Sequence, residues 1–209
     1  MSKTLALFDF DGTITRYDSL IVFLRQMVGV SGAIKGAPET LLRWTALLLQ
    51  GRLSHDAAKE ALLKTHLRRK SRQEWEQEVA IFCSKLGPEY YNPEILRRLR
   101  ELQLSGAVVS IVSASIDIWL QPFADKLNVQ LICTQSAWHA DRWIGFASPN
   151  CRKEEKVRRV QAAYDLAAFD RVVAFGNTAA DHAMLNIADE AWLVEKDGEI
   201  SDWGLGISD

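Results

Sequence analysis

Two aspartates, Asp9 and Asp11, follow an apolar run near the N-terminus, and Gly12 and Thr13 come directly after them. A carboxylate can attack phosphorus to give an aspartyl-phosphate, while a second carboxyl group protonates the leaving oxygen and later deprotonates the water. Two acids beside an anionic substrate would repel it, so this chemistry needs a cation, and oxygen ligands favour Mg²⁺. The pair therefore predicts Mg²⁺-dependent phosphoryl chemistry.

Four polar residues later in the chain have side chains that such chemistry could use: Ser113, Lys156, Asn177 and Asp181. A serine hydroxyl can donate to a phosphoryl oxygen, and a lysine can stabilise the nucleophile and the charge of the transition state. Each type also has a structural interpretation, as a strand-end cap, a solvated helix lysine, or a turn before a helix capped by Thr178. Lys153 competes with Lys156 for the lysine role.

Strands alternating with helices would have to position these residues. Buried strands are predicted at residues 4–10, 107–115, 129–134 and from 171, with helices before and after the second strand at 93–106 and 116–127. This order predicts a three-layer, doubly wound parallel α/β sheet, which binds ligands at the carboxyl ends of its strands. Because side chains i and i+2 share one side of a strand, Asp9 and Asp11 would both extend past the first strand while Phe8 and Phe10 stay in the core.

The stretch from residue 18 to residue 90 shows helical periodicity only. Helices are expected near 18–29, 38–50, 54–68 and 72–86, the last opened by a capping box of Ser71 and Glu74. We expect a small α-helical cap over the sheet edge, with a core domain of residues 1–16 and 92–209 and a cap domain of residues 17–91. The apolar segment 40–50 is interpreted as a bundle-core helix, with contact to a lipid-like substrate or a membrane surface as the alternative.

Composition narrows the class of protein. The 209 residues are 48% hydrophobic, enough for a sizeable core, and the net charge of −2 gives no overall basic field to attract nucleic acid or an anionic membrane. Cys83, Cys133 and Cys151 are few and widely spaced, which fits reduced thiols rather than a disulfide framework or a zinc site. The chain has neither a signal-peptide pattern at its start nor an apolar run long enough to span a bilayer. We expect a cytoplasmic monomer or weak homodimer without an integral membrane segment.

Taken together, the motifs resemble those of the haloacid dehalogenase superfamily of phosphohydrolases over nearly the whole chain. "DFDGT" at residues 9–13 resembles the first signature, Ser113 the second, Lys156 in "NCRKEEKVRRV" the third, and "GNTAAD" at residues 176–181 the fourth, usually "GDxxxD". A helical, C1-type cap between the first two signatures is similar to the phosphoserine-phosphatase-like branch, subfamily IB.

The resemblance implies a role for each matched residue. Asp9 would be the nucleophile and Asp11 the general acid and base. The residues implied to bind phosphate or substrate are Gly12, Thr13, Asp18, Ser113, Ala114 and Lys156. The residues implied to hold Mg²⁺ are Asp9, Asp11 (through its backbone carbonyl), Asn177 and Asp181.

Two of these positions leave alternatives open. In phosphoserine phosphatases an acidic residue shortly after the first signature receives the substrate amine, and Asp18 stands at the corresponding place, although it could instead cap a helix in "YDSL". Asn177 replaces the usual aspartate; its amide oxygen can still bind a metal, but with one negative charge fewer we expect weaker affinity or altered metal preference.

The expected function is hydrolysis of a small phosphorylated metabolite, with phosphoserine and related phosphorylated amino acids or amino alcohols as candidates. The alternatives are a phosphotransferase, a lipid-phosphate phosphatase of the same fold, and a phosphate-binding protein weakened through Asn177. We expect activity to be retained, because both aspartates of the first motif, the serine and a lysine are present.

Overall fold

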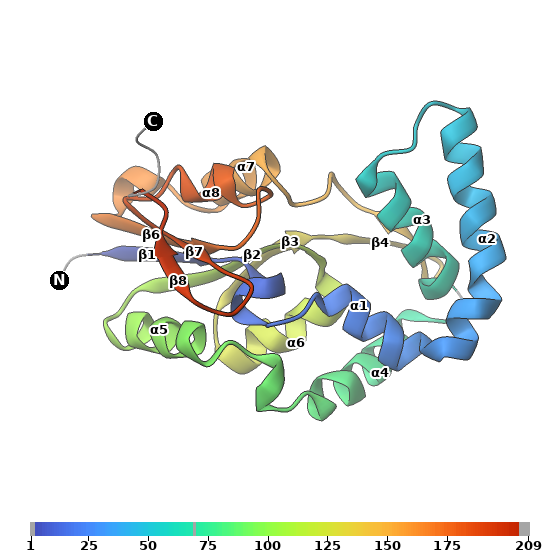
Figure 1. Ribbon diagram of the computed structural model, residues 1–209, viewed down its shortest axis with the longest axis horizontal. Coiled ribbons are helices and arrows are strands. Elements are labelled where there is room, and N and C mark those ends of the chain that lie inside the picture. The colour runs from blue at the N-terminus through green and yellow to red at the C-terminus, as the bar shows by residue number, and fades with distance from the viewer. Residues whose placement is uncertain (1–2, 69, 205–209) are drawn as a thin grey trace.

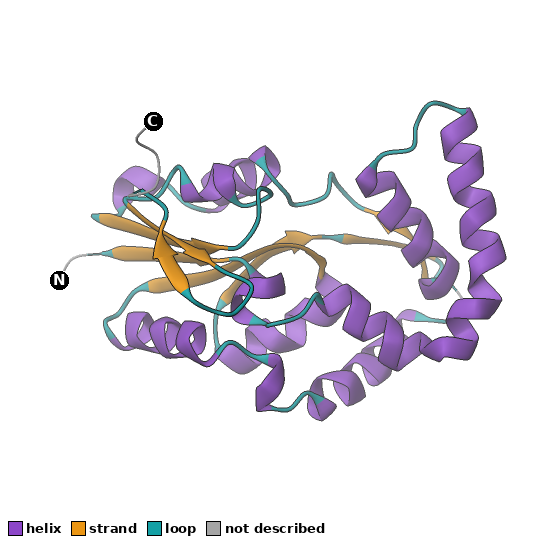
Figure 2. Ribbon diagram, in the orientation of Figure 1, coloured by secondary structure: helices purple, strands orange, loops and turns teal. Residues whose placement is uncertain are grey.

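The computed structural model describes residues 3–68 and 70–204, and within them six strands form one sheet in the order β3-β2-β1-β6-β7-β8 (Figures 1 and 2). The strands are β1 (Thr4–Phe8), β2 (Val108–Ile116), β3 (Gln130–Thr134), β6 (Arg171–Gly176), β7 (Glu190–Val194) and β8 (Ile200–Asp202). All neighbours pair in parallel except β7 and β8. The predicted parallel sheet is confirmed, with an antiparallel edge strand that the sequence did not predict.

Helices cover both faces of the sheet, as the three-layer prediction requires. Figure 1 shows α5 (Pro93–Leu104) and α6 (Asp117–Leu127) on one face, and α7 (Glu154–Ala163) and α8 (His182–Leu185) on the other. The core accordingly falls into two clusters of buried apolar side chains, one on each side of the sheet. Parallel strands covered on both faces bring their carboxyl ends to a single edge, where ligands bind in folds of this kind.

The central strand β1 is buried at every residue, and its Phe8 ring stacks on Phe175 of β6 at a centroid distance of 4.4 Å. The Asp9 amide still donates to the Phe175 carbonyl (2.9 Å), but the chain then makes a wide turn at Phe10–Ile14, in which Gly12 takes a φ of 77°. The expected strand 4–10 was therefore too long, and strand alternation is the wrong explanation for the placement of Asp9 and Asp11. The turn places them, because Gly12 adopts a backbone conformation that favours glycine.

The helical block comprises α1 (Ser19–Phe23), a wide turn (Leu24–Val28), α2 (Gly29–Leu49), α3 (His55–Leu67) and α4 (Arg72–Lys85). The predicted capping box of α4 is confirmed: the Ser71 amide donates to Glu74 (2.7 Å) and the Glu74 amide donates to the Ser71 hydroxyl (3.2 Å). The two connections to the sheet run side by side, with Thr15 paired to Tyr91. The division into residues 17–91 and the remainder stays a prediction.

Helix α2 departs from its predicted environment. Its leucines at 41, 42, 48 and 49 are 63%, 70%, 63% and 83% exposed, so the interpretation of segment 40–50 as a bundle-core helix is wrong. Figure 1 shows why: α2 lies at the outer edge of the molecule with α3 on its inner side. Among the described helices, none is by itself long and apolar enough to cross a membrane.

A two-stranded hairpin, β4 (Ser136–His139) and β5 (Arg142–Phe146), extends from the end of β3 toward the helical block. It was not predicted from the sequence. The Phe146 amide donates to the Glu60 carboxylate of α3 (3.0 Å), and Arg142 pairs with Ser71 at the start of α4. The hairpin therefore holds α3 in place from the core side.

Candidate active site

A cavity of about 510 Å³ lies at the carboxyl ends of the strands, between the sheet and α3. The sequence-predicted residues that line it are Asp9, Asp11, Gly12, Asp18, Ser113, Ala114, Lys156, Asn177 and Asp181. Thr13 is fully buried and donates a long hydrogen bond to Asp9 (3.4 Å). Segments far apart in the sequence thus meet at one edge of the sheet, as parallel pairing of β1, β2 and β6 requires.

The Lys156 ammonium lies at the centre of the buried part of the site. Its Nζ donates to Asp9 Oδ1 (2.6 Å), Asp181 Oδ1 (2.6 Å) and the Val112 carbonyl (2.7 Å), and the residue is 1% exposed. Lys153, the competing lysine, is exposed at the N-terminal end of α7, where its amide donates to the Ala180 carbonyl. The geometry places Lys156, and not Lys153, against the aspartates.

Burial and mutual repulsion shape the charges of this group. Burial, reinforced by repulsion from Asp181, raises the pKa of Asp9 to about 7, although Lys156 opposes the shift. Burial alone would lower the pKa of Lys156, but the carboxylates of Asp9 and Asp181 raise it above its usual range. Burial likewise works against ionisation of Asp181, yet Lys156 holds the pKa of that carboxyl below its ordinary value. The lysine is therefore charged and Asp181 ionised at neutral pH.

Asp11 is held by two donors from different elements. The Ser19 amide, at the start of α1, donates to Oδ1 (2.6 Å), and the Ser115 hydroxyl of β2 donates to Oδ2 (2.5 Å). Burial and the nearby Asp18 carboxylate raise the pKa of Asp11, although both serines oppose the shift. A raised pKa favours the protonated form of the carboxyl group, which is the form that a general acid needs.

Asn177 supplies an oxygen with no partner among the described residues. Its Oδ1 is buried and accepts no hydrogen bond, and a Cβ added at Gly12 would lie 2.0 Å from its Nδ2, so the close approach requires glycine there. A buried unpaired acceptor is costly unless a ligand satisfies it. Among the described residues, Asp9 Oδ2 has only the long Thr13 contact, so Asp9 and Asn177 together offer the hard oxygen donors that Mg²⁺ prefers.

The two remaining predicted ligands are already engaged through their side chains. Asp181 Oδ2 accepts from the amides of Asn177 (3.2 Å) and Thr178 (3.0 Å) and from the Thr178 hydroxyl (3.0 Å), while its Oδ1 faces Lys156. Asp11 is bound to its two serines. In the described chain, no three side chains of the His, Cys, Asp and Glu types are grouped to hold a metal. The side-chain oxygens of Asp9 and Asn177 fit a Mg²⁺ ion, while ligation by the Asp11 backbone carbonyl and by Asp181 stays a prediction.

The haloacid dehalogenase-like hydrolase model matches residues 6–186 of this chain. The chain belongs to this family. It is 31% identical over 192 residues to protein CicA of Caulobacter vibrioides, covering 89% of this chain and 83% of CicA.

Solved structures show the same fold at lower identity. A protein of unknown function from Bordetella pertussis Tohama I superposes with a TM-score of 0.75 at 21% identity, covering 91% of this chain and 89% of that one. A phosphoserine phosphohydrolase-like protein from Francisella tularensis superposes with a TM-score of 0.62 at 20% identity, covering 90% and 85%. The fold of this haloacid dehalogenase-like hydrolase is phosphoserine-phosphatase-like.

Asp18 of the hydrolase has the contacts of a helix cap. Its Oδ1 accepts from the amides of Leu20 (2.9 Å) and Ile21 (3.3 Å) at the start of α1, and the side chain also lines the cavity. The cap interpretation is therefore what the geometry shows, and an added role toward a substrate amine stays a prediction. Ser113 is buried, and its Oγ accepts from the Ser115 amide (3.0 Å).

Three basic residues that line the cavity were not predicted: His55, Lys59 and Arg152. Lys59 of α3 donates to the Ala114 carbonyl (2.9 Å), and its burial lowers the pKa of the ammonium group. Arg152 contacts Asp56 (3.4 Å). The available signal was the four-residue spacing of His55 and Lys59, which places them on one face of a helix expected above the sheet edge.

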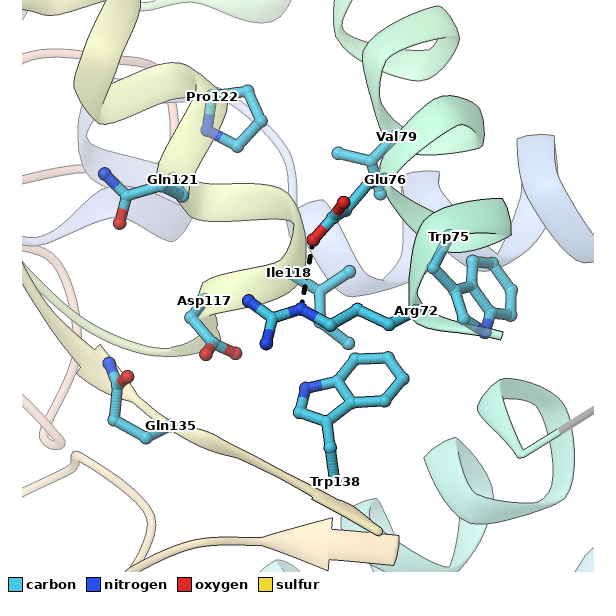
Figure 3. A pocket seen from close by; sticks show the side chains of 10 residues that line it. All are labelled: Arg72, Trp75, Glu76, Val79, Asp117, Ile118, Gln121, Pro122, Gln135 and Trp138. Carbon is cyan, nitrogen blue, oxygen red and sulfur yellow. Dashed lines mark hydrogen bonds and ion pairs between the residues drawn. The ribbon is translucent and has the colours of Figure 1, made fainter. Parts of the chain in front are cut away.

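A second cavity, of about 470 Å³, lies between α4, α6 and β4 (Figure 3). The Arg72 guanidinium lies 5.8 Å from the centroid of the Trp138 ring and pairs with Glu76 (3.0 Å). None of the predicted site residues lines this cavity, so the chemistry belongs to the first one.

Proposed function

We propose that this hydrolase is a Mg²⁺-dependent phosphatase that cleaves a small phosphomonoester through an aspartyl-phosphate on Asp9. The observation that carries the proposal is a buried carboxylate at the base of the cavity, held by the Lys156 ammonium at 2.6 Å and lying beside the raised-pKa carboxyl of Asp11. Membership of a hydrolase family and a phosphoserine-phosphatase-like fold support it.

In the first step an Asp9 carboxylate oxygen attacks phosphorus. A bond forms between that oxygen and phosphorus, the bond from phosphorus to the substrate oxygen breaks, and protonated Asp11 gives its proton to the departing oxygen. The Lys156 ammonium, which already contacts Asp9, stabilises the negative charge that spreads over the phosphoryl oxygens.

In the second step Asp11, now ionised, takes a proton from water as the water oxygen attacks phosphorus. The bond between phosphorus and Asp9 breaks, which releases orthophosphate and restores the Asp9 carboxylate. Asp11 can serve in both directions because Ser19 and Ser115 hold its two oxygens in one orientation throughout.

A Mg²⁺ ion held by Asp9 and Asn177 would supply positive charge that offsets the repulsion between the carboxylates and the incoming phosphoryl group. The buried Asn177 Oδ1, which accepts no hydrogen bond from the residues that the structure describes, supports this assignment.

Substrate choice is assigned to the residues that the helical block presents to the cavity, above all Lys59 and Asp18. An ammonium and a carboxylate at the mouth suit a substrate that carries both charges besides its phosphate, as a phosphorylated amino acid does. Phosphoserine and related compounds are therefore the first candidates.

The test is release of orthophosphate from a panel of phosphorylated amino acids, amino alcohols, sugars, nucleotides and lipid phosphates, with Mg²⁺ and with chelator. We expect metal-dependent turnover that Asp9→Asn abolishes without loss of the fold, and a trapped acyl phosphate that hydroxylamine cleaves. Asp125→Asn, on the exposed side of α6, is the matched control and should be as active as the unmodified protein. Substantial turnover by Asp9→Asn would rule out the nucleophile, and turnover that depends on an organic acceptor would indicate a phosphotransferase.

A further inference from the structure

Two of the three charged residues of helix α2, Glu39 and Arg43, lie on the side that faces the protein, while the third, Lys35, is exposed. Glu39 pairs with Arg43 one turn later (2.9 Å) and with Arg68, which follows α3 (2.6 Å). At 100° per residue, positions 34, 37, 38, 41, 42, 45, 48 and 49 fall within an arc of about 140° on the other side, and none of them is charged. The polarity is the reverse of that expected for a helix on the surface of a soluble protein.

Five large side chains on that arc form what we call the α2 apolar face: Ile34, Leu41, Leu42, Leu48 and Leu49. They are between 63% and 83% exposed. Ile21 on α1 (64%) and Leu53 after α2 (42%) are further exposed apolar side chains of the same part of the chain. Exposed apolar side chains gathered on one helix face mark a surface that binds a membrane or another protein.

We propose that the α2 apolar face docks on an anionic lipid surface. The flanking charges favour this partner: from residue 19 to residue 53 the basic residues are Arg25, Lys35, Arg43 and Arg52, and the single acid, Glu39, is tied to arginines on the inner side. Arg25, Lys35 and Arg52 are exposed. Basic residues beside an apolar helix face are the pattern of interfacial helices, which anionic headgroups attract.

Docking against a second copy of the chain is less favourable. A two-fold dimer brings the same patch of each subunit together, so the basic flanks of the two copies would face one another. No acidic side chain of this segment remains free to pair across such an interface, because Glu39 is already bonded to Arg43 and Arg68.

The shape of the segment suits a helix lying on the membrane rather than crossing it. The segment Ser19–Val28, which is α1 with the wide turn after it, and the segment Ser31–Leu49 of α2 reach the apolar level of a membrane span only when taken together, and the chain bends by 114° between them. Gly29 takes a φ of 66° at the junction, a conformation that glycine adopts readily. A bent pair of this kind can place α2 flat in the headgroup region.

Docking is independent of the chemistry in the active-site cavity, since none of the five side chains lines it. Figure 1 shows α2 on the far side of α3 from the sheet, so an attached membrane would leave the core and the cavity outside the bilayer.

The test is cosedimentation of the full chain with vesicles of phosphatidylcholine, with and without phosphatidylglycerol. We expect binding to the vesicles that contain phosphatidylglycerol, weakened by added salt because the charged flanks are exposed. In the variant Leu42→Glu/Leu49→Glu we expect the affinity to fall by at least about tenfold for each leucine removed from the membrane.

Leu104→Glu is the matched control. Leu104 is 88% exposed at the end of α5, close to the 83% of Leu49, but lies away from α2 (Figure 1). This variant should bind vesicles like the unmodified protein, and all variants should keep the helical content measured by circular dichroism. The proposal is overturned if the unmodified protein fails to sediment with anionic vesicles, or if Leu42→Glu/Leu49→Glu binds them equally well. A dimer in sedimentation velocity that this variant converts to monomers, without vesicle binding by either form, would assign the face to a second copy instead.

Discussion

Replacing Lys156 with methionine removes a buried ammonium and keeps its apolar stem. In the unmodified protein the Asp9 and Asp181 carboxylates and the Val112 carbonyl lie 2.6–2.7 Å from Nζ of Lys156, which is 1% exposed. The change leaves these three groups without their shared donor. Removing one partner of a buried ion pair costs about 3–5 kcal/mol, because the remaining charge is uncompensated. For a chain of this length, we expect the midpoint of thermal unfolding to fall by about 6–20 °C.

The deficit should also depend on pH. In the variant, burial and the neighbouring carboxylates raise the pKa of Asp9 with no ammonium to oppose them, whereas in the unmodified protein that pKa lies at about 7. A folded-state pKa above the unfolded value of 3.8 means that stability declines as pH rises and becomes constant only above the folded-state pKa. The stability of the unmodified protein therefore stops declining near pH 7, whereas that of the variant continues to decline to a higher pH. The difference in unfolding free energy between the two should grow above pH 7.

The assay is urea and thermal unfolding in metal-free buffer at pH values on both sides of 7. Lys153→Met, three residues earlier and exposed, is the matched control and should change the unfolding free energy by less than about 0.5 kcal/mol. Equal losses in the two variants, or a loss below about 1 kcal/mol for Lys156→Met, would show that the lysine does not compensate the two buried carboxylates.

Three further changes test the metal site, the contact between helical block and core, and a surface ion pair. Asn177→Asp should tighten the Mg²⁺ dependence of turnover, because a carboxylate replaces a neutral amide oxygen, and a metal titration of phosphate release measures this. Phe23→Ala should cost about 3–5 kcal/mol in urea unfolding, since the buried Phe23 ring lies 4.7 Å from that of Trp119 in α6. Glu155→Gln should make the free energy of unfolding less dependent on pH in acid. Hydrogen bonds from Arg158 hold the pKa of Glu155 at about 2, so the stabilisation by this carboxylate is present above pH 4.5 and is lost as the pH falls toward 2.

Each of these has an outcome that contradicts it. An unchanged metal titration for Asn177→Asp would mean that residue 177 is not a ligand. Ile21→Ala, on the exposed side of the same short helix as Phe23, should cost less than about 0.5 kcal/mol, and an equal cost for both would refute the packing argument. An acid unfolding curve for Glu155→Gln that parallels the unmodified one would exclude the ion pair as its cause.

The convergence of the site could be predicted for the candidates that lie at or just after the carboxyl end of a strand of the parallel sheet. Asp9 after β1, Ser113 in β2 and Asp181 after β6 meet at the same edge whatever the details of the turns between them. The choice between Lys153 and Lys156 could not be made from spacing, since it depends on where α7 begins. The chain places Lys153 at that start, with a φ of 51°, and turns Lys156 inward.

The hairpin and the environment of α2 could not be predicted, for two different reasons. The tip of the hairpin consists of Ala140 and Asp141 at φ of 44° and 61°, so it lacks the glycine that usually announces such a turn. The apolar content of α2 predicted burial, but periodicity states only that one face is apolar. It does not state whether a protein core or another surface covers that face.

A neutral amide at position 177 avoids adding a further negative charge to the buried group around Lys156. The carboxylates of Asp9, Asp11 and Asp181 and the Lys156 ammonium, when all are ionised, leave two negative charges, which one divalent cation would neutralise. A fourth carboxylate at 177 would add a negative charge beside Asp9, whose pKa burial and repulsion already raise to about 7. If Asp9 is the nucleophile, as proposed, asparagine at 177 would let it ionise with less compensation from a metal, so the site would have lower metal affinity but easier ionisation of the attacking group.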